Sequence, residues 1–164
     1  MKKFLLFMMM LFSVTVFANT TNAKVTNKIN FGISPNELKN IVKSKPLSNS
    51  HDNGDYAVYY YANVEDPLGI KRQLNSFAFD ENQLFSAVFD SVTTDEEHAK
   101  IIEDYKNNAS KVLKEKLNVK EHNGTLIMYN SKKAIEIYRM ENHTFISVYL
   151  YASENLKDIL KNYE

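Results

Sequence analysis

The sequence contains no cysteine and no tryptophan, and it has only four glycines and three prolines in 164 residues. The absence of cysteine excludes disulfides, thiolate metal ligands, a cysteine nucleophile and the lipid-attachment residue of a bacterial lipoprotein. With so few glycines, the chain also has no glycine-rich phosphate loop. The fold must therefore be stabilised by its hydrophobic core.

The chain also lacks an excess of charge of either sign. Twenty basic and twenty acidic residues give a formal net charge of zero. A protein of this composition has no basic field that would attract nucleic acid or anionic lipid. We therefore expect neither of these as a partner.

Only one long apolar run is present, at the start of the chain. Two lysines precede the uncharged stretch Phe4–Phe17, which is shorter than the ~20 residues needed to cross a bilayer. Small or permissive residues before Asn19 suit a signal peptidase. The sequence predicts a signal peptide over residues 1–18, cleavage between Ala18 and Asn19, and a periplasmic or secreted product without a stable membrane anchor. An uncleaved anchor is the alternative.

Residues 19–164 are predicted to form a single α+β domain. Two helix starts are marked by a Ser or Thr followed three residues later by a glutamate, Ser34 with Glu37 and Thr94 with Glu97. These are capping boxes. Apolar residues then recur three and four positions apart, which predicts helices over 34–43 and 94–116. A short C-terminal helix, capped by Ser153, is also expected.

Six segments rich in Tyr, Phe, Val and Ile are predicted to be strands. They are residues 56–64, 71–80, 83–92, 125–130, 133–140 and 144–152. The polar residues 47–55 are predicted to form a loop. Short connections favour antiparallel pairing. The expected fold is thus α+β, with a six-stranded antiparallel sheet, helices on one face and a short C-terminal helix.

The two halves of the domain, about residues 31–91 and 92–152, follow the same plan. At a constant offset of sixty residues, Ser34 aligns with Thr94 and Phe85 aligns with Phe145. An unchanged offset at the first helix and at the last hairpin favours a tandem αβββ duplication. Two meanders that converged on the same spacing are the alternative.

The segment INFGISPNELKNIVKSKPL, followed by strands ending in FAFDENQLFSAVF, resembles the β-lactamase-inhibitor-protein-like and outer-membrane-assembly lipoprotein (SmpA/OmlA, BamE-like) units. The matching positions are Phe31, Gly32, Ser34, Glu37, Leu38 and Pro46. The sequence departs from the pattern at Lys45, where the family has a glycine, and in the second half, which lacks the glycine and proline. The resemblance implies a small exported domain that binds proteins, and it carries over no catalytic residue.

No constellation of catalytic or metal-binding residues is visible. The histidines have no i, i+4 pair of the helical metal-site type; they are His51, His98, His122 and His143. His51 with Asp52 and Asp55 could hold a cation, but the group lacks the full set of oxygen ligands of a calcium loop, and a turn is the preferred interpretation. We expect no metal, no cofactor and no enzyme activity, with an enzyme of unrecognised site as an alternative.

The remaining feature is the set of ten tyrosines and ten phenylalanines. Two-residue turns at Glu81-Asn82 and Glu141-Asn142 would give the sheet an aliphatic face toward the helices and an aromatic open face. The candidate partner-binding residues on the open face are Tyr59, Tyr61, Phe85, Phe89, Tyr129, Tyr138, Phe145, Tyr149 and Tyr151. Tyr129 joins this set through a two-residue turn at Ser131-Lys132, and Tyr59 and Tyr61 join it if Val58 points inward. Such rings are typical of protein-binding surfaces, but Tyr and Phe are also good strand formers on a half-exposed sheet.

The leading hypothesis is an exported, soluble, non-enzymatic domain that binds an unidentified protein partner through the aromatic open face. It would act as an inhibitor of a secreted enzyme or as an envelope adaptor. The second hypothesis is a carrier that holds a small apolar ligand between the sheet and the helices. The two differ in whether the aromatic rings point outward to an interface or inward to a pocket.

Overall fold

The computed structural model describes residues 23–47, 51–52, 56–151 and 155–163. The predicted signal peptide, its cleavage point and the predicted Ser153 cap lie outside these residues. The side chains of the His51, Asp52 and Asp55 group also lie outside the description.

Within these residues the chain forms helices and antiparallel strands. The helices are α2 (Pro35–Val42), α3 (Asp95–Leu113) and α4 (Leu156–Leu160), which continues into the 3-10 turn η2 (Lys161–Tyr163). The strands are β1 (His51–Asp52), β2 (Tyr56–Glu65), β3 (Lys71–Asp80), β4 (Gln83–Val92), β5 (Asn118–His122), β6 (Thr125–Tyr129), β7 (Lys133–Met140) and β8 (His143–Leu150). All six predicted strands are present, and the α+β class is confirmed.

Both predicted capping boxes are present. The backbone N–H of Glu37 donates to Ser34 Oγ at 3.3 Å, and the N–H of Ser34 donates to the Glu37 carboxylate at 2.8 Å. Thr94 and Glu97 make the same pair of hydrogen bonds, at 3.2 and 2.8 Å. Helix α3 ends before the predicted Lys116, because Lys114 adopts a left-handed conformation with a φ of 56°.

The strands form one sheet in the order β1-β2-β3-β4-β8-β7-β6-β5. In the described part of the chain the sheet therefore has eight strands, and the predicted count of six is wrong. The short β1 falls in the polar segment that the sequence predicted as a loop. Strand β5 is exposed at four of its five positions, so its sequence lacks the alternation of apolar and polar residues that reveals a strand.

The last strands of the two predicted halves, β4 and β8, lie side by side at the centre of the sheet. Val88 of β4 pairs with Ser147 of β8. From this central pair, each half continues outward through three further strands to an edge, at β1 on one side and at β5 on the other.

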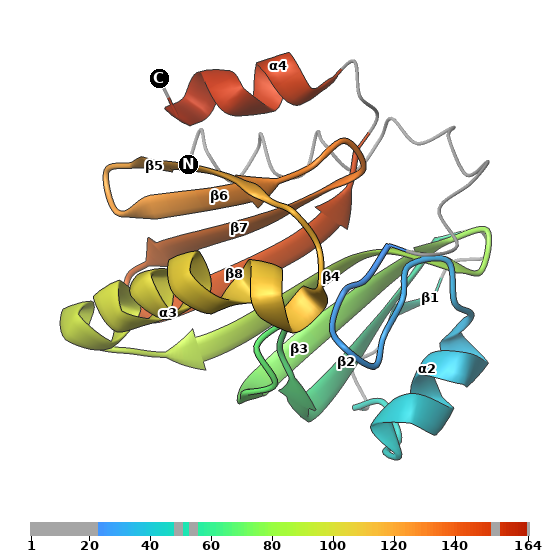
Figure 1. The fold of residues 1–164 in the computed structure, drawn as a ribbon. Coiled ribbons are helices and arrows are strands. Elements are labelled where there is room, and N and C mark those ends of the chain that lie inside the picture. Colours follow the sequence, from blue (N-terminus) through green and yellow to red (C-terminus); the bar gives the residue numbers. More distant parts are fainter. Residues whose placement is uncertain (1–22, 48–50, 53–55, 152–154, 164) are drawn as a thin grey trace.

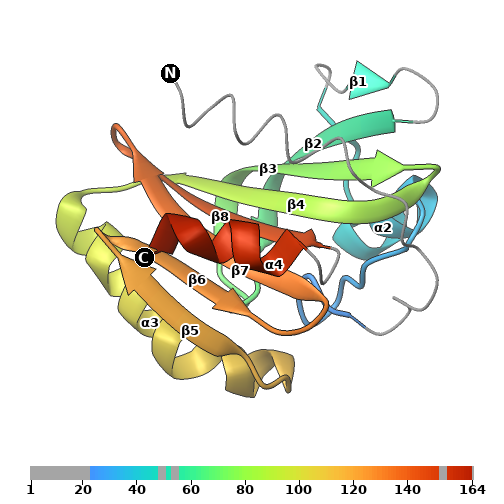
Figure 2. The ribbon, with the colours of Figure 1, turned by 90° about the horizontal axis from the view of Figure 1, so that it is seen from above.

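The helices lie on both faces of the sheet (Figure 1). Helices α2 and α3 pack on one face, where Leu38 of α2 and Tyr105 of α3 join Phe77 and Ile137 in the main core; none of these four side chains is exposed. Helix α4 lies across the opposite face (Figure 2), where Ile159 and other residues form a smaller apolar cluster. The sequence did not place this helix on a face.

Candidate functional site

Cross-strand pairing assigns each side chain to a face, because directly paired residues point to the same side of a sheet. The sequence predicted that one face of the sheet is aliphatic and meets the helices. In the second half, the face that meets α2 and α3 does contain the aliphatic residues expected there, which are Ile135, Ile137, Ile146, Val148 and Leu150. We call the opposite side the α4 face. One row across it consists of Tyr60, Ser76, Val88, Ser147, Glu136 and Ile127.

A β-bulge in the β3–β4 hairpin reverses the predicted faces of β4. Phe79 pairs with Leu84, whereas Ala78 pairs with Ser86, so Phe85 is the extra residue. Beyond a bulge, every residue changes sides relative to a regular hairpin. The predicted position of Phe89 on the open face is therefore wrong. Phe89 is fully buried in the main core, and Val88 takes the α4 face.

Tyr59 and Tyr61 also lie on the opposite side from the prediction. Their prediction depended on Val58 pointing inward, but Val58 pairs with Ala78 on the α4 face. The Tyr61 ring is therefore buried, with its centroid 5.8 Å from that of Phe77. Tyr59 packs against the same core.

Phe85 and three tyrosines of the predicted set are largely covered. The bulge residue Phe85 is buried, and its ring centroid lies 6.1 Å from that of Tyr56. Tyr129, Tyr149 and Tyr151 pack around the apolar cluster beneath α4. Burial there raises the pKa of the Tyr149 hydroxyl well above its ordinary value.

Tyr138 and Phe145 remain beside α4 as a half-buried pair. They are cross-strand partners on β7 and β8, and their rings stack with a centroid distance of 5.3 Å and an angle of 20°. The His143 ring also stacks with Phe145, at a centroid distance of 6.0 Å and an angle of 22°. Its Nδ1 lies 2.9 Å from the carboxylate of Asp90 on β4. We call the stacked rings of Tyr138, Phe145 and His143 the ladder. The contact between His143 and Asp90 connects the ladder to β4, in the other half of the sheet.

Three exposed apolar side chains surround this ladder. Leu74 is 40% exposed, Val92 is 52% exposed and Met140 is 47% exposed. Leu74 pairs with Asp90, while Val92 and Met140 both pair with His143 from either side. We define the ladder patch as these three residues together with the three rings of Tyr138, His143 and Phe145. Contiguous exposed apolar residues of this kind mark interaction sites.

Sequence reasoning missed four members of the ladder patch: Leu74, Val92, Met140 and His143. For Met140 and His143 the signal was available, because the predicted two-residue turn at Glu141-Asn142 already pairs them on the face of Tyr138. The positions of Leu74 and Val92 beside the rings could not be predicted, because they depend on the bulge in β4 and on the pairing of β4 with β8.

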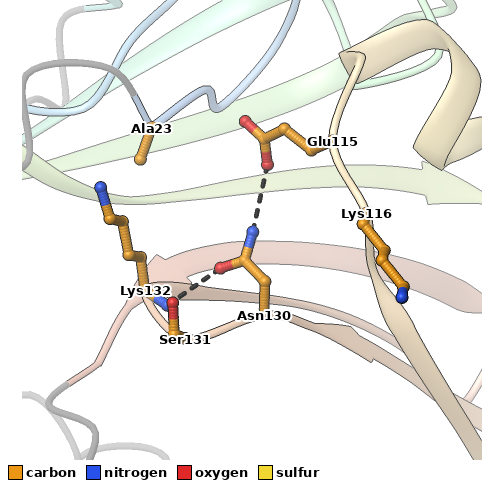
Figure 3. A pocket seen from close by; sticks show the side chains of 6 residues that line it. All are labelled: Ala23, Glu115, Lys116, Asn130, Ser131 and Lys132. Atoms are coloured by element: carbon orange, nitrogen blue, oxygen red, sulfur yellow. Dashed lines mark hydrogen bonds between the residues drawn. The ribbon is translucent and has the colours of Figure 1, made fainter.

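A separate polar hollow of about 290 Å³ is lined by Ala23, Glu115, Lys116, Asn130, Ser131 and Lys132 (Figure 3). The Glu115 carboxylate accepts hydrogen bonds from the Asn130 amide and from the backbone N–H of Lys24, both at 3.3 Å. It also lies 2.9 Å from the ammonium of the buried Lys133. Because three donors already occupy this carboxylate, the hollow is a structural junction between chain segments.

The three histidines whose side chains the structure describes, His98, His122 and His143, do not converge on a common site. The Nε2–H of the buried His98 donates a hydrogen bond of 2.9 Å to the carbonyl of Gly124. Its Nδ1 shares a hydrogen bond of 2.9 Å with Thr144 Oγ1. His122 contacts its neighbour Asn123. In the part of the chain that the structure describes, no three His, Asp or Glu residues are grouped as metal ligands.

Two further observations bear on function. None of the helices in the described ranges combines the length and apolar character required to span a bilayer. Comparison of the chain with protein-family models, curated proteins and solved structures finds no match. The resemblance based on the Phe31–Pro46 segment therefore stays a prediction.

Proposed function

We propose that this chain is an exported, non-enzymatic domain that binds a protein partner through the ladder patch. The observation that carries the proposal is the clustering of Leu74, Val92 and Met140, all more than a third exposed, around the stacked rings. Aromatic residues and methionine are enriched at protein interfaces, and anchors for binding are typically large side chains surrounded by weaker contacts.

The patch is also well ordered for binding. Its residues lie on four adjacent strands, and the contact of His143 with Asp90 links the two central ones. Side chains that are already held in one geometry lose less conformational entropy when a partner binds. This favours a rigid docking surface, which suits both an inhibitor of a secreted enzyme and an envelope adaptor.

We also propose that the domain arose by tandem duplication, as the sequence offset indicates. The symmetric strand order about the β4–β8 pair and the two capping boxes support this proposal, with four strands in each unit instead of three. Helix α4 then makes the two units unequal, because it covers the part of the second unit around Ile127 and Ala134 and leaves the ladder patch uncovered.

The two alternative functions gain no support from the described residues. A carrier needs space between the sheet and helices α2 and α3, but side chains there such as Phe77, Phe89 and Ile137 have no exposed surface. An enzyme needs a nucleophile, a base and an orienting group within reach of one another. The closest arrangement, Asp90 with His143, has no nucleophile among its described contacts.

Photo-crosslinking in the producing cells tests the proposal. A photoreactive phenylalanine analogue replaces Met140 in the patch or, as a matched control, the exposed Lys39 on α2. We expect a discrete protein adduct from position 140 only. Excess wild-type chain should suppress it, and excess chain carrying Met140→Ser and Phe145→Ala should not. Equal adducts at both positions, or equal suppression by both competitors, would overturn the proposal.

A further inference from the structure

Carboxylates gather at one end of the ladder patch. Val92 leads through two threonines into Asp95 and Glu96 at the start of α3, and Met140 is followed by Glu141. All three acidic residues are exposed, and the side chain of Asp95 is 92% exposed. The acidic rim, defined as Asp95, Glu96 and Glu141, therefore lies within a few residues along the chain of Val92 and Met140, two of the exposed apolar residues of the patch.

The backbone holds this rim in place. The N–H of Thr93 donates to the carbonyl of Asn142 at 2.8 Å, which fixes the β4–α3 junction against the β7–β8 turn. The hydroxyls of Thr93 and Thr144 share a buried hydrogen bond of 2.7 Å. The ring of His98, on α3, also hydrogen-bonds to the hydroxyl of Thr144. The carboxylates thus project from a rigid junction and do not depend on a flexible loop.

Arg139 on β7 offsets part of the negative charge of the rim. Arg139 donates to the carbonyl of Thr93 at 2.8 Å and forms an ion pair with Asp95. Glu96 and Glu141 add two further negative charges, and Asp90 lies within the patch itself, beside His143. The patch therefore combines apolar contact area with a negative field, which attracts cations and repels anionic surfaces.

We infer that the partner is a protein segment with an apolar or aromatic side chain flanked by Lys or Arg. This inference rests on the proposed function and names the chemistry of its partner. The apolar side chain would cover Leu74, Val92 and Met140. The flanking cations would face the acidic rim, where ionic attraction adds to the apolar contact.

The test uses purified residues 19–164, which contain every described element, and a displayed library of random peptides as the probe. We expect the enriched peptides to carry Lys or Arg beside an apolar residue. Two double variants then dissect the binding of these peptides: Met140→Ser with Phe145→Ala for the patch, and Glu96→Gln with Glu141→Gln for the rim. Glu103→Gln with Glu121→Gln, two acidic residues that share Lys106 at the β5 edge, gives the matched change in charge away from the patch.

Each outcome separates the two proposals. We expect the patch variant to abolish binding, and the rim variant to weaken it about three- to tenfold at low salt and less at high salt. The control should retain wild-type affinity. If the patch variant abolishes binding but the peptides lack cations and the rim variant binds normally, the inference fails and the proposed function stands. If the patch variant binds normally, the proposed function fails, and the inference fails with it.

Discussion

The hydroxyl of Tyr163, in the 3-10 turn η2, donates a hydrogen bond to the carboxylate of Glu136 on β7. This contact ties the C-terminal segment to the α4 face beside the apolar residues Ile127 and Ala134. Burial is the largest effect on Glu136 and raises the pKa of its carboxyl, while hydrogen bonds from Tyr163 and Tyr149 partly oppose the rise. The docking of α4 therefore places an acidic group in a poorly hydrated position.

Glu136 should make the stability of the domain depend on pH. Because its folded-state pKa is raised, its stabilising contribution is complete below the ordinary value of 4.5 and is lost as pH rises through the folded-state pKa. Glu136→Gln, which stays neutral, should remove that loss. The unfolding free energy of the variant relative to wild type should therefore increase between about pH 4 and about pH 7.

Denaturant titrations at several pH values measure this difference. Glu141→Gln, at an exposed turn, is the matched control and should show no such increase. A difference between Glu136→Gln and wild type that is the same at both ends of the pH range would contradict the prediction.

Ile159 should anchor α4. An isolated helix of this length has little stability of its own, so α4 depends on packing of its apolar side chains, and Ile159 is its buried residue. Ile159→Ala should release the segment 155–163 and leave the rest of the fold intact. Hydrogen exchange should become faster at the backbone of α4 and remain slow in β3. Lys157→Ala, at an exposed position of the same helix, should leave both unchanged.

Phe89 and Val88 should respond in opposite ways to truncation, because the bulge places only Phe89 in the core. Phe89→Ala should lower the unfolding free energy by about 3–5 kcal/mol through loss of burial and cavity formation. Val88→Ala, at a half-buried position on the α4 face, should cost less than about 1 kcal/mol. Chemical denaturation measures both values. A larger cost for Val88→Ala would mean that β4 follows the regular hairpin register.

The two helix caps should contribute similarly to stability. Ser34→Ala and Thr94→Ala each remove an acceptor for a backbone N–H at the start of a helix, and each should cost about 1 kcal/mol. Asn36→Ala, an exposed position inside α2, is the control and should change stability by less than either cap. Equilibrium unfolding gives these values. If neither Ser34→Ala nor Thr94→Ala lowers the free energy of unfolding, the helix starts do not depend on their caps.

Features that depend on neighbouring residues could be predicted from the sequence. The starts of α2 and α3 follow from a Ser or Thr that reaches an N–H three residues ahead, an interaction within a single turn. The strands from Tyr56 to Val92 follow from dense aromatic and β-branched residues with turn formers between them. The faces of β7 and β8 follow from one two-residue turn, which fixes the register of the whole hairpin.

Features that depend on distant contacts were decided only by the tertiary structure. Phe89 and Val88 lie on the opposite faces from those predicted, because the extra residue Phe85 in the bulge moves every later side chain of β4 to the other side of the sheet. No neighbouring residue in the sequence indicates that bulge. Strand β5 forms because its backbone pairs with β6, although its side chains are mostly exposed and carry no pattern.

The sequence by itself thus determined the starts of α2 and α3, six of the strands, the antiparallel α+β class and the aromatic character of the open face in the second half. The tertiary structure decided which of those aromatic residues solvent can reach. Helix α4 packs against Tyr149 and its neighbours and covers part of their surface, because the apolar side of a short helix gains more from covering a sheet than from remaining in water. The same packing leaves Phe145 and Met140 uncovered, since the helix is too short to extend over the whole face.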